Sequence, residues 1–277
     1  MIKATNLSKS IEGFQILKGI NIDIAPNEIT VVFGPSGSGK TTLLRNLSLL
    51  DIPDTGELSI DNAQYNFPAD YQNIIRPYPK MTVVFQQLFL WPHLTNKENI
   101  TLALNKEDYK DRKRRLKFLI TELEMEDYID KYPNQSSLGQ KQRVAIARAL
   151  ILKPNYIFFD EITAALDTVQ TTHLIRIIKR ISRQKGETGI LFVTHNLEVA
   201  KMIADKVIFL DTGVIVERGT IEIFTNPQTK ELKSFLKNTE HTEPLGDKDN
   251  ITDKTIEITT PDTNNEGQGN AKILGND

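Results

Sequence analysis

The chain has 277 residues, of which 39% are hydrophobic and 25% charged, and it contains no cysteine. A chain of this length and composition can bury the core of one large domain or two modest ones, and the lack of cysteine excludes a disulfide framework and a thiolate metal site. The 34 Lys and Arg residues nearly balance 36 Asp and Glu residues, for a formal charge of -2, so no overall basic field indicates a nucleic-acid partner.

The N-terminal part predicts a strand, a turn, a buried strand and then a helix. Residues 19–24 alternate between polar and apolar side chains, Pro26 and Asn27 mark a turn, and residues 29–33 (ITVVF) form a continuous apolar run. A helix is expected soon afterwards, over residues 40–50. No apolar run approaches the roughly 18 residues of a membrane-spanning helix, and the first residues lack the apolar centre of a secretory signal.

The middle of the chain differs in its predicted secondary structure from the parts on either side. Residues 56–81 show short strand patterns and turns with several prolines, and residues 96–152 are mostly helical in pattern. After Pro154 strands and helices alternate again, over residues 156–160, 171–181, 190–194, 196–204 and 206–219. This alternation predicts a parallel sheet flanked by helices, with the middle of the chain as an insertion.

Residues 238–277 have a composition of their own. They are rich in Thr, Asn, Asp, Glu and Gly and contain no aromatic residue. Nine acidic and three basic residues give this segment a charge of -6, which leaves +4 for the rest of the chain. Such a composition cannot bury enough apolar surface to offset the entropy of ordering, so we expect a disordered acidic tail that acts as a tether or a regulatory extension.

The segment GPSGSGKTT, residues 34–42, fits the phosphate-loop pattern GxxxxGK[ST] and lies between a buried strand and a helix, as the pattern requires. Glycines let the backbone wrap phosphate oxygens, and the helix start adds free N–H groups and partial positive charge. Lys40 would reach the outer phosphates, and Thr41 would offer its hydroxyl to Mg²⁺. The expected nucleotide-binding residues are Gly34, Pro35, Ser36, Gly37, Ser38, Gly39, Lys40, Thr41 and Thr42.

Two adjacent carboxylates, Asp160 and Glu161, follow the apolar run YIFF at the end of a predicted strand. Doubly wound sheets hold their ligands at this edge. The first carboxylate can hold Mg²⁺, often through water, and the second can orient and deprotonate an attacking water. Acidic residues also cap strand ends for structural reasons, but the phosphate loop in the same chain favours a catalytic pair.

His195 and Gln86 also stand where predicted strands end. His195 precedes Asn196, a candidate N-cap, so it is either a polar turn residue or a side chain that reaches the γ-phosphate from a neighbouring strand. Gln86 follows TVVF, and its amide can complete Mg²⁺ coordination or hold the water. The predicted catalytic residues are Glu161, His195 and Gln86, and the predicted metal ligands are Thr41, Gln86 and Asp160.

Two further segments have alternative interpretations. The stretch LFLWPHLT places Phe89, Leu90 and Trp91 in an irregular segment that either packs under the helical region or, as we favour, docks a partner. The basic cluster KDRKRR, residues 110–115, precedes apolar residues at helical spacing and lacks interleaved aromatic residues. We therefore expect it to be the solvated start of an amphipathic helix and not a nucleic-acid site.

The stretch NQSSLGQKQR contains a helix start. Ser137 and Gln140 fit the capping pattern S-x-x-[EQ], so a helix is expected from Leu138 to a stop at Lys153 and Pro154. Its first N–H groups are donors at the positive end of a helix, which suits a phosphate. On spacing alone this is a plain helix start, but a second anion site is reasonable if it serves the nucleotide of another copy of the chain.

Residues 1–236 resemble the ATP-binding subunits of ABC transporters in the order of their motifs. These motifs are the phosphate loop, FQQ, the helix that starts at LGQ, the hydrophobic run that ends in DE, then ALD and TH. The resemblance implies a Walker A loop at residues 34–42, a Q-loop glutamine at Gln86, Walker B with its catalytic glutamate at Asp160 and Glu161, a D-loop aspartate at Asp167 and a switch histidine at His195. It also implies that Asp167 and the signature residues Ser137, Gly139 and Gln140 contact ATP.

The stretches LSKSIEGFQILKGINIDI, VVFQQLFLWPHLTNKENITLAL and VIVERGTIEIFTNPQTKELKSFL resemble the ATPases of polar amino-acid uptake systems. The resemblance implies an α/β P-loop NTPase fold with a RecA-like core, an antiparallel β subdomain and an inserted α-helical subdomain that bears the signature. We expect an ABC ATPase domain over residues 1–237. Its core and β subdomain would lie in 1–85 and 154–237, its helical subdomain in about 86–153, and the acidic tail would follow in 238–277.

The resemblance also implies the partners. Two copies would form a head-to-tail homodimer that holds two ATP molecules, with Mg²⁺, between the phosphate loop of one copy and the signature of the other. The dimer would bind integral membrane permease subunits as a peripheral component at the cytoplasmic face of the inner membrane and energise uptake of polar amino acids. A substrate-binding protein would be an indirect partner, and no nucleic acid is expected.

The chain departs from the family pattern at several positions. Leu138 replaces the first glycine of the usual LSGGQ, and Ile162 and Ala164 replace the proline and serine of DEPTSALD. The adenine-stacking aromatic residue expected near Ile11 is missing, so we assign that contact to Phe14. Each lost contact is expected to weaken nucleotide affinity by about 1 to 3 kcal/mol. The polar groups needed for hydrolysis are all present.

Other interpretations stay open at this point. The ATPase of an ABC exporter would carry the same motifs. A degenerate module that dimerises or regulates with only weak hydrolysis would fit the altered signature. A soluble ABC protein of translation or DNA maintenance is disfavoured, because the chain has a single cassette, no long coiled-coil insertion and no basic groove.

Overall fold

The structure is a computed structural model that describes residues 1–104, 109–185 and 188–240. The chain divides into two units, Met1–His241 and Thr242–Asp277, and the second unit lies outside the described residues. Helix α7 (Lys230–Glu240) continues past the predicted boundary at residue 237. The remainder of the predicted acidic tail lies outside the described residues.

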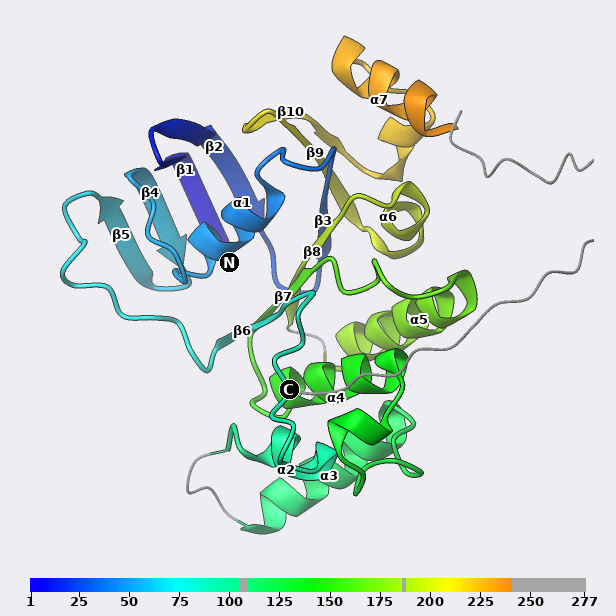
Figure 1. Cartoon of the computed structure of the whole chain (residues 1–277). Helices are drawn as coiled ribbons and strands as arrows, with labels where there is room; N and C mark the ends of the chain where they lie inside the picture. The colour runs from blue at the N-terminus through cyan, green and yellow to red at the C-terminus, as the bar shows by residue number, and fades with distance from the viewer. Residues whose placement is uncertain (105–108, 186–187, 241–277) are drawn as a thin grey trace, which may run out of the picture. The chain divides into compact units, whose positions relative to one another are not determined.

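A six-stranded sheet forms the centre of the first unit, with strand order β10-β9-β3-β8-β7-β6 (Figure 1). Neighbouring strands run parallel except for β10, which pairs antiparallel with β9 at the edge. The strands are β3 (Ile29–Phe33), β6 (Met81–Val84), β7 (Tyr156–Asp160), β8 (Gly189–Thr194), β9 (Lys206–Asp211) and β10 (Val214–Gly219). Every residue of β3, β7 and β8 is buried, which explains why their sequences are continuous apolar runs.

The segment predicted as one strand over residues 206–219 is instead the hairpin β9–β10. Thr212 and Gly213 both have positive φ, 45° and 82°, and Asp211 pairs with Val214 across the turn. A two-residue turn with positive φ at both positions matches the right-handed twist of paired strands. The sequence prediction was wrong here because the flanking runs are apolar enough to look continuous.

The two faces of the six-stranded sheet are covered by different layers. In β3, Val31 and Phe33 belong to a core shared with helices, whereas Val32 between them belongs to the core on the opposite face. The first face is covered by α4 (Leu138–Leu150), α5 (Thr168–Lys185), α6 (Leu197–Ile203) and α7. The second face is covered by α1 (Lys40–Leu47) and a four-stranded sheet. Alternation of side chains along a strand produces this division.

The four-stranded sheet is antiparallel, with order β2-β1-β4-β5. Its strands are β1 (Ile2–Ile11), β2 (Phe14–Ile24), β4 (Thr55–Ile60) and β5 (Ala63–Phe67). Exposed and buried residues alternate along much of β2, β4 and β5, so one face joins the core and the other faces outward. This sheet is the β subdomain that the sequence predicts.

A helical region follows β6. It contains α2 (Asn96–Thr101), α3 (Tyr109–Glu122), the short 3₁₀ helix η1 (Pro133–Gln135) and α4; a second 3₁₀ helix, η2 (Ile221–Phe224), follows β10. Helix α4 begins at Leu138 as predicted, with Ser137 as its N-cap and Gln140 completing the capping box, and ends at Leu150, earlier than predicted. The described part of the chain contains no helix that is long and apolar enough to cross a membrane.

The basic cluster at residues 110–115 is not uniformly solvated, so this prediction was wrong for Arg115. Arg115 is only 9% exposed, and its guanidinium group donates a hydrogen bond of 2.6 Å to the carbonyl oxygen of Ile151. Its Nε atom also lies 3.2 Å from Asp111 Oδ2. The last carbonyl groups of a helix lack partners within the helix, and Arg115 supplies one at the end of α4.

Candidate functional site

The carboxyl ends of neighbouring parallel strands bring most of the predicted site residues to one edge of the sheet. Strand β3 leads into the phosphate loop, β7 ends at Asp160, β8 ends just before His195, and β6 ends two residues before Gln86. Strand pairing places Phe33 opposite Thr194 and Asp160 opposite Val193. The order β3-β8-β7-β6 therefore sets the four strand ends side by side.

The phosphate loop is closely packed beneath and open at the start of α1. A side chain on Gly34, whose φ is 155°, would collide with the carbonyl oxygen of Leu210, so only glycine fits there. Gly39 is the N-cap of α1 and provides no side-chain cap. The Ser38 hydroxyl is buried and has no hydrogen-bond partner among the described residues. An uncapped helix start and an unpartnered hydroxyl are what a bound phosphate would satisfy.

Lys40 is folded back against this loop. The residue is 5% exposed, and its Nζ atom donates hydrogen bonds of 3.0 and 2.8 Å to the carbonyl oxygens of Gly34 and Pro35. Burial lowers the pKa of the Lys40 ammonium, while the nearby carboxylates of Glu161 and Asp160 act in the opposite direction. The loop thus holds the Lys40 ammonium group at the place where we expect the outer phosphates of a nucleotide.

Thr41 and Asp160 form a pair of oxygen ligands. The Thr41 hydroxyl donates a 3.0 Å hydrogen bond to Asp160 Oδ1. Burial raises the pKa of the Asp160 carboxyl, an effect that the hydrogen bond from Thr41 opposes. Gln86 borders the same hollow as Asp160. Hydroxyl, carboxylate and amide oxygens suit a hard cation such as Mg²⁺.

No group of three or more His, Cys, Asp or Glu residues that could hold a metal occurs within residues 1–104, 109–185 and 188–240. A cation near Asp160 would therefore depend on the Thr41 hydroxyl, one carboxylate and oxygens from water or phosphate. Mg²⁺ commonly binds in this way, with one or two carboxylates and the oxygens of a substrate phosphate. The residues present thus fit Mg²⁺ held jointly with a nucleotide.

The Glu161 carboxylate lies between two nitrogen atoms. Its Oε1 atom is 3.9 Å from Lys40 Nζ, and its Oε2 atom is 3.2 Å from His195 Nδ1. Glu161 has a φ of 47°, which is uncommon for a residue with a side chain, and its N–H group donates a 3.0 Å hydrogen bond to the carbonyl of Val193. The backbone therefore leaves the direction of β7 at Glu161, beside the end of β8.

Phe14 stands near the phosphate loop. Gly39 and Gly213 both approach the backbone of Ile16, and Phe14 lies two residues from Ile16 on the same face of β2. The Phe14 residue is 74% exposed, and Ile11 is its partner on β1. An exposed aromatic ring at this position can stack on a flat ligand group.

The structure does not bring the remaining predicted site residues to the phosphate loop of the same chain. The Ser137 hydroxyl accepts a 3.3 Å hydrogen bond from the Gln140 N–H, and Gln140 Oε1 accepts one of 2.9 Å from the Ser137 N–H. Asp167 accepts a 2.8 Å hydrogen bond from the N–H of Gln170 and so caps the start of α5. Gly139 lies beside the Gln170 side chain.

The segment after Gln86 is partly packed. Phe89 and Trp91 are exposed, whereas Leu90 packs against the core. Arg148 on α4 donates hydrogen bonds of 2.6 and 2.7 Å to the carbonyl oxygens of Leu88 and Phe89. The favoured interpretation of this segment as a surface that docks a partner is therefore wrong for Leu90, which packs inward.

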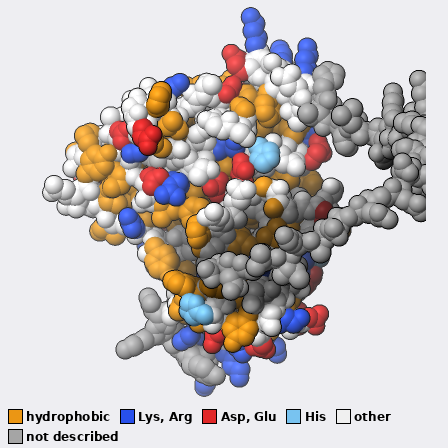
Figure 2. All heavy atoms as spheres, viewed as in Figure 1, with side chains coloured by type: hydrophobic (Ala, Val, Ile, Leu, Met, Phe, Trp, Pro, Cys, Tyr) orange, Lys and Arg blue, Asp and Glu red, His pale blue; other side chains and the backbone are white. Residues whose placement is uncertain are grey.

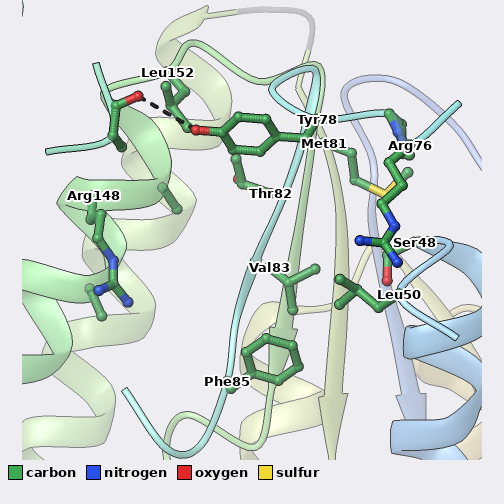
Figure 3. A pocket seen from close by; sticks show the side chains of 14 residues that line it. Ser48, Leu50, Arg76, Tyr78, Met81, Thr82, Val83, Phe85, Arg148 and Leu152 are labelled. Carbon is green, nitrogen blue, oxygen red and sulfur yellow. Dashed lines mark hydrogen bonds between the residues drawn. The ribbon is translucent and has the colours of Figure 1, made fainter. Parts of the chain in front are cut away.

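A separate cleft of about 290 Å³ lies between α4 and the end of α1 (Figure 3). Figure 3 shows Arg148 on the α4 side, Leu50 and Arg76 on the opposite side, and Tyr78 across one end. Most of its other lining side chains are apolar, and no Asp or Glu occurs among the lining residues. The cleft lies next to the segment that carries Phe89, because Arg148 borders the cleft and binds that segment.

Sequence reasoning missed several residues that connect these parts. Gln142 on α4 donates a hydrogen bond of 2.5 Å to the carbonyl oxygen of Ile162, which follows Glu161. Gln170 donates a hydrogen bond of 2.5 Å to Asp167 Oδ2. The spacing D-x-x-Q of Asp167 and Gln170 is a helix-start signal that could have found this pair. The position of Gln142 in the helical repeat of α4 predicts that its side chain is buried, but it does not predict which group the side chain bonds to.

A phosphate loop between a buried strand and a helix, with a lysine inside it and carboxylates at the end of a nearby parallel strand, defines the class of P-loop NTPases. Residues 17–164 match the ABC transporter family. The chain belongs to this family, which confirms the resemblance inferred from the sequence, and it is an ATP-binding ATPase of the cassette type.

Relatives and solved structures agree with this assignment. The chain is 41% identical over 243 residues to the arginine transport ATP-binding protein ArtP of Haemophilus influenzae, covering 85% of this chain and 98% of that protein. It is 38% identical over 242 residues to the L-cystine import ATP-binding protein TcyC of Bacillus subtilis, covering 85% and 97%. It also resembles the dimeric cassette MJ0796, solved in a post-hydrolysis state bound to ADP and Pi, with a TM-score of 0.69 at 34% identity over 80% of this chain and 99% of that one.

Proposed function

We propose that the chain is the ATP-hydrolysing subunit of a transporter that takes up polar amino acids. The observation that carries the proposed chemistry is the position of Glu161, whose two carboxylate oxygens face Lys40 and His195 at the edge of the sheet. Lys40 marks the phosphate side of the site and His195 the neighbouring strand end. A base between them is well placed to act on a water molecule next to the terminal phosphate.

In the proposed reaction, Glu161 accepts a proton from a water molecule while the water oxygen bonds to the γ-phosphorus. The bond between the γ-phosphorus and the oxygen that bridges to the β-phosphate breaks, and ADP and inorganic phosphate form. Lys40 offsets the negative charge of the phosphate oxygens, and His195 orients Glu161 and contacts the γ-phosphate. Thr41, Asp160 and Gln86 would hold Mg²⁺, which when bound supplies further positive charge to the phosphates.

We propose that the Phe14 ring stacks on the adenine base of the nucleotide. We also propose that another copy of the chain supplies the remaining contacts to each nucleotide. The Phe14 ring is exposed on the face of β2 that adjoins the loop. Ser137, Gly139, Gln140 and Asp167 would contact the nucleotide of the partner copy. The dimeric arrangement of the MJ0796 cassette supports this assignment, as does the position of these residues away from their own phosphate loop.

We assign the cleft in Figure 3, together with Phe89 and Trp91, to the membrane permease subunits. Exposed apolar side chains occur in both, with Leu50 and Tyr78 in the cleft and Phe89 and Trp91 in the segment. Figure 2 shows hydrophobic side chains gathered along the flank that carries β5 and the connection to β6, and again over the helical region. An apolar segment of an integral membrane partner would cover such a surface.

The proposed solute rests on the relatives. Their names record transport of arginine and import of L-cystine, and both proteins match this chain along almost their whole length. ATP is supplied inside the cell, so the subunit would work at the cytoplasmic face of the inner membrane, bound to the permease. A substrate-binding protein would deliver the solute on the other side without contacting this chain.

Two experiments test the proposal. Glu161→Gln should abolish ATP turnover while the variant still binds ATP, because the amide keeps the shape of the carboxylate but cannot accept the proton. Continued hydrolysis by this variant would remove Glu161 from the catalytic role. Proteoliposomes that contain the assembled transporter should accumulate arginine or cystine only with ATP inside, and accumulation of neither would remove the proposed class of solute.

A further inference from the structure

Helix α4 is tied to the segment that follows β7 by two glutamine side chains that the proposed reaction does not use. Gln142 on α4 bonds to the carbonyl oxygen of Ile162, the residue after Glu161, at 2.5 Å. Gln170 on α5 bonds to Asp167 Oδ2 at 2.5 Å. Its Oε1 atom lies so close to Gly139 that a methyl group there would come within 2.8 Å of it. The start of α4 is thus linked to both ends of residues 161–167.

Gln142 is a costly residue for the stability of the chain. It is 4% exposed, and its Oε1 atom has no hydrogen-bond partner among the described residues. A buried amide oxygen without a partner lowers the free energy of unfolding. A methionine of similar length would fill the same space without this cost, but it would leave the Ile162 carbonyl oxygen without the donor that Gln142 supplies. The two effects oppose each other in the free energy of unfolding, and the bond to Ile162 is the contact that distinguishes glutamine from methionine here.

Gly139 has a corresponding role on the other side of the link. A side chain at this position would come within 2.8 Å of Gln170 Oε1, so the end of the Gln170 side chain, which also bonds to Asp167, would have to shift. The glycine therefore allows Gln170 to lie between the start of α4 and the start of α5. Gln170 is exposed, so its bond to Asp167 can be removed without opening the core.

We propose that Gln142 and Gln170 are positioning residues that couple the two nucleotide sites of the dimer. This inference rests on the proposed head-to-tail dimer. In that dimer residues 160–161 serve the nucleotide of their own chain, whereas Ser137 and Gly139 serve the nucleotide of the partner copy. A shift of Glu161 on nucleotide binding then moves Ile162, and through Gln142 it moves the helix that contacts the other nucleotide.

The link can be measured inside a single chain by hydrogen exchange with mass spectrometry. The full-length protein is studied with and without ADP, at a concentration where sedimentation shows one chain. In the natural protein ADP should slow amide exchange in α4 by about fivefold, the lower end of usual coupling factors. In Gln142→Met and in Gln170→Ala this effect should be lost, while calorimetry shows unchanged ADP affinity.

Thermal unfolding separates positioning from a merely structural role. Gln142→Met should unfold at about the same temperature as the natural protein, because removal of the unpartnered amide oxygen offsets the loss of the donor to the Ile162 carbonyl. A structural role predicts the reverse, a lower unfolding temperature with the effect of ADP on α4 retained. Gln64→Met, an exposed position on β5, is the matched control and should change neither quantity.

The same coupling should appear in the hydrolysis of ATP by the dimer. The natural protein should show a Hill coefficient above 1, and the variant with both Gln142→Met and Gln170→Ala should fall to about 1. The inference is overturned if the variants bind ADP and still slow exchange in α4, or if the natural protein itself has a Hill coefficient of 1. Failure of the natural protein to bind ADP would instead overturn the proposed function, and this inference with it.

Discussion

The Nδ1 atom of His195 lies 3.2 Å from the Oε2 atom of Glu161. The two residues come from the ends of β8 and β7, which are neighbours in the sheet, so the contact depends on strand pairing and not on nearness in the sequence. The pair places the proposed base and the group proposed to orient it at the same edge as the phosphate loop.

His195→Ala should reduce ATP turnover by about 10²- to 10⁴-fold, the usual range for loss of general base catalysis, because Glu161 loses the group that orients it. ATP binding should change much less, because Lys40 and the loop are untouched. Steady-state hydrolysis and a separate binding titration would measure the two effects. His173→Ala is the matched control: His173 also contacts a glutamate, Glu124, at 2.9 Å, but on α5. An equal loss in both variants would contradict the assignment.

Asp160→Asn should make the nucleotide-free protein more stable while it abolishes Mg²⁺-dependent ATP binding. Burial raises the pKa of the Asp160 carboxyl, so folding disfavours its ionised form. The cost is present at neutral pH and is relieved as the pH falls through the raised pKa, where the carboxyl becomes protonated. The asparagine is neutral throughout and keeps an oxygen for the bond from Thr41.

Calorimetry at pH 8 should therefore show a higher unfolding temperature for the variant, by roughly 2 to 4 °C for each kcal/mol by which the substitution raises the free energy of unfolding. The difference from the natural protein should shrink at acid pH. Asp130→Asn, at an exposed ion pair with Lys97, should leave the unfolding temperature unchanged. A less stable Asp160→Asn variant at pH 8 would show that ionised Asp160 helps the fold.

Leu138→Gly should tighten the ATP-bound dimer. Leu138 is 41% exposed at the first position of α4, beside Ser137 and Gly139, so its side chain adds bulk where the second copy is proposed to approach. We expect the dimer to tighten by roughly tenfold, equivalent to about 1.4 kcal/mol. Sedimentation with ATP in the Glu161→Gln background would measure it. The dimer affinity of Leu138→Ala should fall between those of the natural protein and Leu138→Gly. An unchanged affinity in both variants would show that the interface tolerates the leucine side chain.

Glu217→Gln should lower stability at neutral pH but not in acid. Glu217 accepts hydrogen bonds of 2.9 Å from the N–H groups of Gln228 and Thr229 and one of 2.6 Å from the Thr229 hydroxyl, just before α7. Burial acts to raise the pKa of the Glu217 carboxyl, but these bonds outweigh it and the pKa is lowered. The ionised carboxylate therefore favours the folded state above its ordinary pKa.

That contribution is lost as the pH falls through the lowered pKa of the folded protein. At pH 7 we expect the variant to lose about 1 kcal/mol, as for a helix cap. Unfolding curves at pH 7 and near pH 3 would show a difference that disappears in acid. Glu57→Gln, an exposed position on β4, should show no difference at either pH, and a gap that persists in acid would contradict the charge argument.

The sequence was sufficient to predict the fold class and the ends of the strands that carry the site, although it missed the end of β9. Runs such as ITVVF and YIFFD are apolar throughout because the sheet is covered on both faces, and this pattern is visible without a structure. The helix start at Leu138 was equally predictable, because a capping box depends only on residues 137–140.

Contacts that depend on which strands are neighbours were not predictable. The sequence alone does not state that β8 lies between β3 and β7, and only this order places His195 beside Glu161. The bonds made by Gln142 and Arg115 join residues from different elements and depend on the conformation of one side chain. The hairpin at Thr212 was missed because threonine is not a usual residue at positive φ.

The Asn99 side chain, fully buried, accepts a 2.7 Å hydrogen bond from the N–H of Trp91 and donates to the carbonyl oxygens of Trp91, Leu94 and Thr95. The backbone around Trp91 is therefore rigid before any partner arrives. A protein that binds there loses little conformational freedom in the loop and meets a single shape. Its association rate should then depend on diffusion and orientation, and differences in affinity among variants of the proposed permease partner should appear mainly in the rate at which the complex dissociates.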